Sequence, residues 1–467
     1  MAKVARPSSK NSKSSTPRFS KRYARLEEMP VVHRRAAGID LGGATSHFVA
    51  VEVGDEIEVQ EFGVSTPQLQ QMAAYLARHG VTTIGMEATG VYWVPVYDLL
   101  EQSGFEVYLA NPSHVKNVPG RRKDDKLDCK WLQKLHKYGL LSASFRPDEA
   151  FRPLRSLQRQ RARLVKQSAD EVRRMQRALD AMNLGLHKVV SDICGKTGMR
   201  IIRAILDGEH DPGVLAKMRD RRCRCTEEEL REAMTGFYQG HYLRDLRQTL
   251  ARYELYMQQL TELDTDIETY LQTLIPLPDE EVAARVEAST HALPEGKHVP
   301  AYNVTAYVEL VLGQDPTTLP GIAGQLALGL LAELGPDMSK WPTDKQFGSY
   351  LTLAPQPKIS GGKVLSTRTR PGPPPAAALF KQAAAAVIRT DTALAAFYRR
   401  LALTRGKGKA LTALAYKIAK LYYHLLLEGK SYIELGEERY EAKYLQHQVR
   451  LLEKKAKQLG FTVVSTA

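Results

Sequence analysis

Long apolar runs are missing from this sequence, and its N-terminus lacks the apolar core of a signal peptide. A membrane-spanning helix needs about 20 mostly apolar residues, so we expect no membrane association and no export. Cysteine is also scarce. The four cysteines predict reduced thiols in a cytoplasmic protein rather than a disulfide framework; they are Cys129, Cys194, Cys223 and Cys225. Cys223 and Cys225 have no second pair or flanking histidines, so a zinc site is not expected.

Acidic residues are depleted in three segments of a chain that has 467 residues and a net charge of +14. Residues 1–35 hold ten Lys/Arg and two Glu, residues 151–190 ten basic and three acidic residues, and residues 360–420 twelve basic residues and a single acid. Residues 226–290 reverse the balance, with fourteen acidic and five basic residues. Basic blocks are typical of nucleic-acid-binding surfaces, although any one block is equally compatible with a solvated charged face.

The chain is long enough for two to four domains. Residues 1–30 have almost no large aliphatic side chains before Leu26, so we expect a disordered basic arm. Residues 31–150 have an α/β pattern, with strands expected at 36–39, 46–53, 56–63, 82–86 and 105–110 and helices at 67–79, 93–103 and 126–138. Three antiparallel strands followed by alternating helices and strands is the order of a ribonuclease H-like fold. Actin-like phosphotransferases share that fold, so the order alone does not choose a function.

Four carboxylates lie at positions where a metal site is expected. Asp40 and Glu87 each end an apolar run and precede a Gly-containing turn, while Asp125 and Asp128 lie three residues apart on one helix face. Such oxygen clusters bind hard cations such as Mg²⁺, and two metals about 4 Å apart can clamp a phosphoryl transfer. Each acid alone also has a structural interpretation, such as a cap or a solvated surface residue. Asp124 neighbours Asp125, and either side chain could face inward.

Residues 151–290 have apolar side chains at intervals of three and four, over 172–186 and again over 243–274. Only Asp264 interrupts the second series. This repeat predicts two long antiparallel helices forming a coiled-coil arm, joined through residues 187–240. A two-helix segment within one domain core is the alternative.

Residues 291–430 are expected to form a mostly helical domain, with a polar loop at 355–375, and residues 431–467 a charged C-terminal helix. The loop contains Ser360, Gly361 and Gly362, surrounded by the cations Lys358, Lys363, Arg368 and Arg370. A serine hydroxyl beside glycines could attack a phosphodiester if it were activated. Ser-Gly-Gly is also ordinary loop composition.

Several blocks together resemble the DEDD transposases of bacterial mobile elements, insertion-sequence family 110. The blocks are Gly38-Ile39-Asp40, Met86-Glu87-Ala88-Thr89-Gly90, Asn111-Pro112, Lys123-Asp124-Asp125-Lys126-Leu127-Asp128, Leu319-Pro320-Gly321-Ile322, Leu353-Ala354-Pro355 and Ser360-Gly361-Gly362. Their order extends over about residues 31–430. The resemblance implies a RuvC-like domain with a coiled coil and a C-terminal transposase domain. It assigns Asp40, Glu87, Asp125 and Asp128 to Mg²⁺ or Mn²⁺ and Ser360 to the nucleophile.

The same resemblance implies strand exchange through a phosphoserine intermediate. The implied partners are donor and target DNA, an element-encoded guide RNA, and further copies of the chain in a dimer to tetramer. A cytoplasmic, nucleoid-associated bacterial protein is expected. We assign nucleic-acid contacts to the following cations and glycines: Arg121, Arg122, Lys123, Gly361, Gly362, Lys363, Arg368 and Arg370.

Three other functions compete with this interpretation. A metal-dependent, structure-specific nuclease of the Holliday-junction type would use the carboxylates and water alone. An actin-like sugar or acetate kinase would share the turn after Asp40, but the later Gly-rich phosphate loops of that class are missing here. A non-catalytic nucleic-acid binder would not need all four acids.

Overall fold

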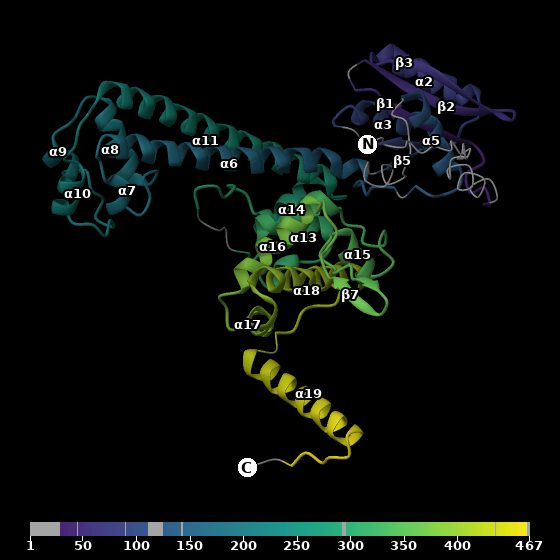
Figure 1. Cartoon of the computed structure of the whole chain (residues 1–467). Coiled ribbons are helices and arrows are strands. Elements are labelled where there is room, and N and C mark those ends of the chain that lie inside the picture. Colours follow the sequence, from purple (N-terminus) through teal and green to yellow (C-terminus); the bar gives the residue numbers. More distant parts are fainter. Residues whose placement is uncertain are drawn as a thin grey trace, which may run out of the picture. The chain divides into compact units, whose positions relative to one another are not determined.

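A computed structural model describes residues 29–43, 45–88, 90–110, 125–141, 143–291, 296–434 and 436–464, with the backbone alone at 125 and 126. The chain divides into two compact units between Arg146 and Pro147 (Figure 1). Almost all of the predicted basic arm, residues 1–30, lies outside the described residues. In the part that is described, no helix is long and apolar enough to span a membrane.

The first unit contains a five-stranded sheet with the strand order β3-β2-β1-β4-β5. The strands β1 (Ala36–Leu41), β2 (Ser46–Val53) and β3 (Glu56–Gly63) pair antiparallel. The strands β4 (Thr83–Glu87) and β5 (Glu106–Ala110) run parallel to β1, with β4 beside it. Helices α2 (Thr66–Arg78) and α3 (Trp93–Gln102) make the connections that parallel strands require. This topology fits the ribonuclease H-like fold predicted from the sequence.

The two faces of this sheet carry different helices. Alternate residues of a strand point to opposite faces, and Ala37, Ile39 and Leu41 pack in one hydrophobic core with side chains of α2 and α3. The other face of β1 packs on α5 (Asp125–Lys137), because a Cβ at Gly38 would lie only 2.2 Å from the Gln133 amide nitrogen. Gly38 therefore allows the α5 backbone to lie directly on β1.

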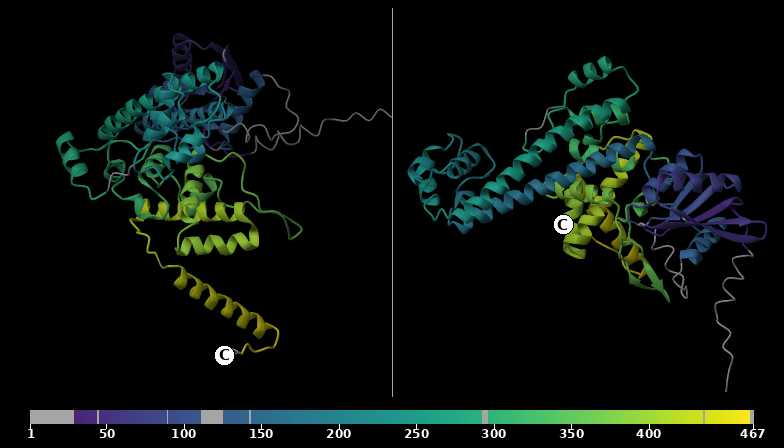
Figure 2. Two further views of the ribbon diagram at one scale, coloured as in Figure 1. Left: turned by 90° about the vertical axis from the view of Figure 1, so that its left-hand side faces the viewer. Right: turned by 90° about the horizontal axis from the view of Figure 1, so that it is seen from above.

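The second unit begins with two long helices, α6 (Arg152–Ala181) and α11 (Gly240–Leu274), which lie side by side (Figures 1 and 2). They are antiparallel, because Arg161 pairs with Asp264 whereas Glu171, further along α6, pairs with the earlier Arg252. The two long helices predicted from the sequence are thus present. Whether they work as a coiled coil stays a prediction.

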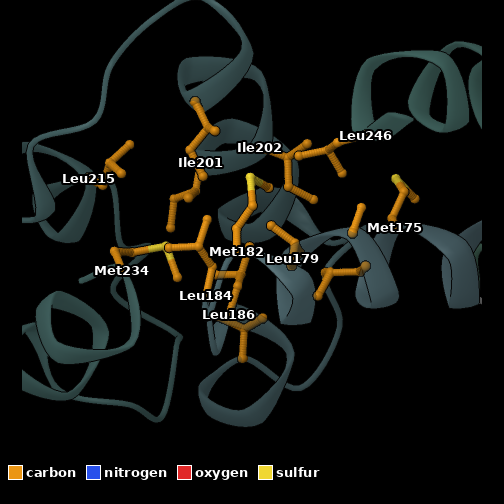
Figure 3. Packing of buried hydrophobic residues seen from close by; sticks show 14 of the residues in the cluster. Met175, Leu179, Met182, Leu184, Leu186, Ile201, Ile202, Leu215, Met234 and Leu246 are labelled. Carbon is orange, nitrogen blue, oxygen red and sulfur yellow. The ribbon is translucent and has the colours of Figure 1, made fainter. Parts of the chain in front are cut away.

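The segment between the long helices has a core of its own, which the sequence did not predict. Four short helices share this core with side chains of α6 and α11: α7 (Leu186–Val189), α8 (Lys196–Leu206), α9 (Pro212–Lys217) and α10 (Glu227–Ala233). Figure 3 shows buried side chains from several of these elements meeting, among them Met182, Leu186, Ile201 and Leu246. The linking segment is therefore a packed helical subdomain.

The remainder of the second unit is mainly helical. Its helices are α12 (Asp279–Glu287), α13 (Val304–Leu312), α14 (Gly324–Leu334), α15 (Asp344–Tyr350), α16 (Pro375–Val387), α17 (Ala393–Arg405), α18 (Lys407–Glu428) and α19 (Glu437–Gln458). Short 3-10 turns occupy Glu149–Phe151 and Pro316–Thr318. Buried Glu333 joins α14 to α6, since it accepts from Arg155 Nε at 2.9 Å and from Arg159 Nε at 2.6 Å.

The polar loop expected at 355–375 is only partly a loop. Within it, β6 (Lys358–Ser360) and β7 (Lys363–Ser366) pair as an antiparallel hairpin. Gly361 and Gly362 have φ angles of 54° and 75°, the left-handed conformation that a type I′ two-residue hairpin turn requires at both positions. Gly361 and Gly362 thus form a tight turn between the two strands.

Candidate active site

Asp40 lies on the α5 face of the sheet, near the carboxyl end of β1. It follows Gly38 by two residues, so both point to the same face, and Gly38 is the residue that contacts α5. Asp40 is half-buried. The acid is thus held at the end of a strand beneath a helix rather than in open solvent.

Glu87 is placed in the same way at the end of the neighbouring strand. β4 pairs parallel with β1, with Ile39 opposite Met86, so Asp40 and Glu87 follow at the same end of the two strands. Gly85 faces α5, because a Cβ there would lie 3.0 Å from the Cβ of His136. Glu87 shares that face by alternation and is only 7% exposed.

Helix α5 runs antiparallel to β1, which brings its N-terminal end to the two strand ends. Gln133 Nε2 donates to the carbonyl oxygen of Ala36 at 3.4 Å, at the start of β1. One turn earlier along α5, a Cβ at Gly38 would lie 2.3 Å from the Cys129 carbonyl oxygen. Asp128 and the backbone of Asp125, earlier still, therefore lie toward the end of β1 that carries Asp40.

Electrostatics agree with this placement. Burial raises the pKa of the Cys129 thiol to about 12, and the negative charge of Asp40 adds to the rise. Cys129 is fully buried directly beside Asp128 in the chain. The Asp40 carboxylate must therefore lie close to the first turns of α5 for its charge to act there.

The structure brings Asp40, Glu87 and Asp128 to one face and one end of the sheet. Among the described side chains, which do not include that of Asp125, no three His, Cys, Asp or Glu groups lie close enough together to hold a metal ion. The oxygen-only donor set at adjoining strand ends still fits the chemistry of a hard divalent cation. Arg121, Arg122, Lys123 and Asp124 lie outside the described residues.

Ser360 belongs to the second unit, where it is the last residue of β6. It pairs with Lys363 across the Gly361-Gly362 turn and is exposed. A serine at this position presents its hydroxyl at the tip of a hairpin, where the flanking glycines have no Cβ to block an approaching backbone.

The base of the hairpin borders a basic groove with a volume of about 1230 Å³. Four cations line it, namely Lys358, Arg368, Arg370 and Lys381. Arg370 also donates to the carbonyl oxygen of Ser349 at 3.2 Å, which fixes one side of the groove to the last turn of α15. Sequence reasoning assigned Arg368 and Arg370 but missed Lys381. That lysine lies among alanines on α16, eleven residues beyond Arg370, the last Arg of the polar segment, so no local pattern marks it.

Two family models match the chain. The model described as "Transposase" matches residues 37–184, and the model described as "Transposase IS116/IS110/IS902 family" matches residues 317–399. No curated protein matches the chain. The first match contains Asp40, Glu87, Asp125 and Asp128, and the second contains Ser360 and the groove cations.

The protein is therefore a transposase, a recombinase of a mobile element that cuts and rejoins DNA. It belongs to the IS110 family of DEDD transposases, as the sequence blocks predicted. Membership implies DNA as the substrate and dependence on a divalent metal.

Proposed function

We propose that this transposase exchanges DNA strands with a carboxylate-bound metal and a serine nucleophile, guided by an RNA that its mobile element encodes. The observation that carries the metal half is the common placement of Asp40 and Glu87 at adjoining ends of β1 and β4, under the N-terminal end of α5. Asp125 and Asp128 on that helix complete the proposed set.

Mg²⁺ or Mn²⁺ bound by these four residues would stabilise charge on the attacking and leaving oxygens of the phosphoryl transfer. The chain itself supplies orientation. The ends of β1 and β4 carry Asp40 and Glu87, and the close contact of Gly38 with α5 holds the helix that carries Asp128 against β1.

In the serine part of the proposed reaction, a phosphoserine intermediate conserves the energy of the broken phosphodiester bond. Ser360 Oγ forms a bond to the phosphorus of one DNA strand, while the bond to the departing deoxyribose oxygen breaks and that oxygen gains a proton. A deoxyribose hydroxyl of another strand then attacks the phosphoserine, releases Ser360 and forms the new phosphodiester without net hydrolysis. The exposed hairpin tip and the basic groove at its base support this role, because the groove offers cations to the DNA backbone.

We further propose that α6 and α11 work as a coiled-coil arm and that two to four copies assemble, so that the carboxylates of one copy serve the serine of another. Basic residues 151–190 and 360–420 would then bind the guide RNA and the donor and target DNA. This part of the proposal rests on the charge distribution and on the family resemblance.

A DNA-joining assay with Mg²⁺ and the element's RNA tests the function. Asp128→Asn should lower joining by about 100-fold or more, since metal stabilisation is worth several kcal/mol, while DNA binding persists. Ser360→Ala should abolish both joining and the covalent protein–DNA adduct. Ser339→Ala, an exposed serine of the second unit outside the hairpin and the groove, is the control and should retain both.

The opposite results would identify the competing function. Cleavage by Ser360→Ala at the wild-type rate, with no adduct in either protein, would make the enzyme a metal-dependent structure-specific nuclease. Full joining by Asp128→Asn would remove Asp128 from the metal site.

A further inference from the structure

α19 has no buried residue, although it carries a regular apolar stripe. Leu445, Val449, Leu452 and Leu459 are 65%, 40%, 58% and 66% exposed. With Ala442 and Ala456 they follow one another at alternating intervals of three and four residues. That spacing is the seam of a coiled coil, in which the a positions are 442, 449 and 456 and the d positions 445, 452 and 459. We call these six residues the α19 seam.

The contacts that hold α19 to the rest of the second unit lie on its opposite face. Arg400 of α17 places Cζ 3.7 Å from the centre of the Tyr444 ring and 5.1 Å from that of Tyr440, and Arg399 pairs with Glu437. Residues 437, 440 and 444 are c and f positions, the outer side of a helix whose a and d positions form the seam. Anchoring α19 in this way leaves the seam directed away from α17.

We propose that the α19 seam binds the α19 seam of a second copy of this chain, with the two helices antiparallel. α19 lies beyond both segments that match the transposase models, which end at residues 184 and 399. The pairing is therefore a property of this chain's own C-terminal extension, and it is independent of the proposed chemistry.

Side-chain size favours the antiparallel arrangement. When the helices cross between residues 450 and 451, Ala442 faces Leu459 of the second copy, Leu445 faces Ala456, and Val449 faces Leu452. Every layer then joins one leucine to a smaller side chain, alanine or valine, which gives even packing along the seam. In a parallel pair, Ala442 would face Ala442 of the second copy and Ala456 would face Ala456. These two layers would hold only small side chains and would be poorly packed.

Charge favours the same arrangement. Residues 437–447 contain three acidic and two basic side chains, whereas residues 448–458 contain one acidic and four basic side chains. Antiparallel pairing brings the acidic half of one helix beside the basic half of the other, and parallel pairing brings like halves together. The flanking positions also avoid repulsion, because Gln446 faces Glu453 and Gln448 faces Lys455 of the second copy.

Site-specific disulfide formation tests the pairing. Full-length Ala442→Cys and Leu459→Cys proteins, purified free of nucleic acid, are mixed and mildly oxidised. Only the mixture should form a disulfide-linked dimer above the wild-type background from the four native cysteines. Cross-linking of Ala442→Cys alone would show a parallel pair and overturn the proposal. A mixture that forms no cross-link would also overturn the proposal.

A charge placed in the seam provides a second test of the pairing. Leu452→Glu, introduced into both cysteine proteins, should reduce the cross-linked yield by about tenfold or more, because it buries an unpaired carboxylate. Leu451→Glu is the matched control, since Leu451 is also exposed, at 48%, but lies outside the seam. It should leave the yield unchanged. Equal yields from both variants, with circular dichroism showing that α19 is still helical, would overturn the proposal.

Discussion

Arg161 and Asp264 form an ion pair that joins α6 to α11 inside the second unit. Arg161 Nε lies 2.5 Å from Asp264 Oδ1, and Arg161 Nη2 lies 3.1 Å from Asp264 Oδ2. The same guanidinium donates to the carbonyl oxygen of His298 at 2.5 Å, so it also holds the segment before α13. Asp264 is the one residue that interrupts the apolar series of α11. Its partner on the facing helix explains why a carboxylate is tolerated there.

Breaking this pair should destabilise the helix pair strongly. Asp264→Leu leaves the buried guanidinium without its carboxylate and should lower the free energy of unfolding by about 3–5 kcal/mol. Arg161→Leu together with Asp264→Leu should recover most of that loss, because no unpaired charge remains. Urea unfolding of the single and double variants measures the coupling. Asp170→Ala, which removes the exposed pair with Arg173, should change little. A double variant no better than Asp264→Leu would contradict this.

Gly38→Ala should inactivate the enzyme without removing any charge. The new methyl group would meet backbone atoms of Cys129 and Gln133 at 2.3 and 2.2 Å, so α5 must move away from β1 and take Asp128 with it. We expect a loss of about 1–3 kcal/mol in stability and a larger proportional loss of DNA joining. Gly240→Ala, with no atom within 4 Å of the added Cβ, is the control. Joining at the wild-type level by Gly38→Ala would show that the α5 position does not matter.

Two substitutions at Gly361 test whether the hairpin turn positions Ser360. Its φ of 54° is tolerated by Asn but opposed by β-branched side chains. Gly361→Asn should therefore keep the turn and most of the joining activity, whereas Gly361→Val should cost more than about 1–2 kcal/mol locally and displace Ser360. Adduct formation by the two variants, each with normal thermal unfolding, is the measurement. Equal adduct yields would show that the turn geometry does not affect the reaction of Ser360.

Groove cations should govern the salt dependence of DNA binding. Arg368→Ala should weaken binding to all DNA sequences alike and reduce the slope of log K against log salt by about 1, because one phosphate contact is lost. Lys381→Ala should behave in the same way if α16 forms part of the surface. Lys217→Ala, an exposed lysine on α9, serves for comparison. If neither groove variant changes the slope of log K against log salt, DNA does not bind in this groove.

Acid should destabilise the first unit through His136. Burial lowers the pKa of His136 to about 4, and His33 adds to the shift through charge repulsion. The unfolded chain takes up this proton near pH 6.5, so stability is complete above that pH and falls as the pH drops toward 4. Between pH 7 and pH 5 the loss should be about 2 kcal/mol. Urea midpoints of His136→Gln should vary less with pH than those of the wild type. Replacing exposed His79 should not have this effect.

Local pattern was sufficient for the first unit. The strands predicted at 46–53 and 56–63 have the bounds of β2 and β3, and α5 begins and ends one residue before the predicted helix at 126–138. Asp40 and Glu87 were predicted as site residues because each lies where an apolar run ends, and the structure places both at adjoining strand ends. The sequence pattern did not predict that Asp40 and Glu87 lie on the face of the sheet that α5 covers. That outcome depends on which side of the sheet the helix packs.

The sequence by itself determined the order of strands and helices, the acids at strand ends and the repeat along the two long helices, because these follow from periodicities of two to four residues. Only the tertiary structure decided that Arg161 neutralises Asp264, that Lys381 joins the cations of the groove at the base of the hairpin, and that the segment between α6 and α11 has its own core. These contacts join residues far apart in the chain, and local periodicity does not indicate which distant residue a side chain will contact.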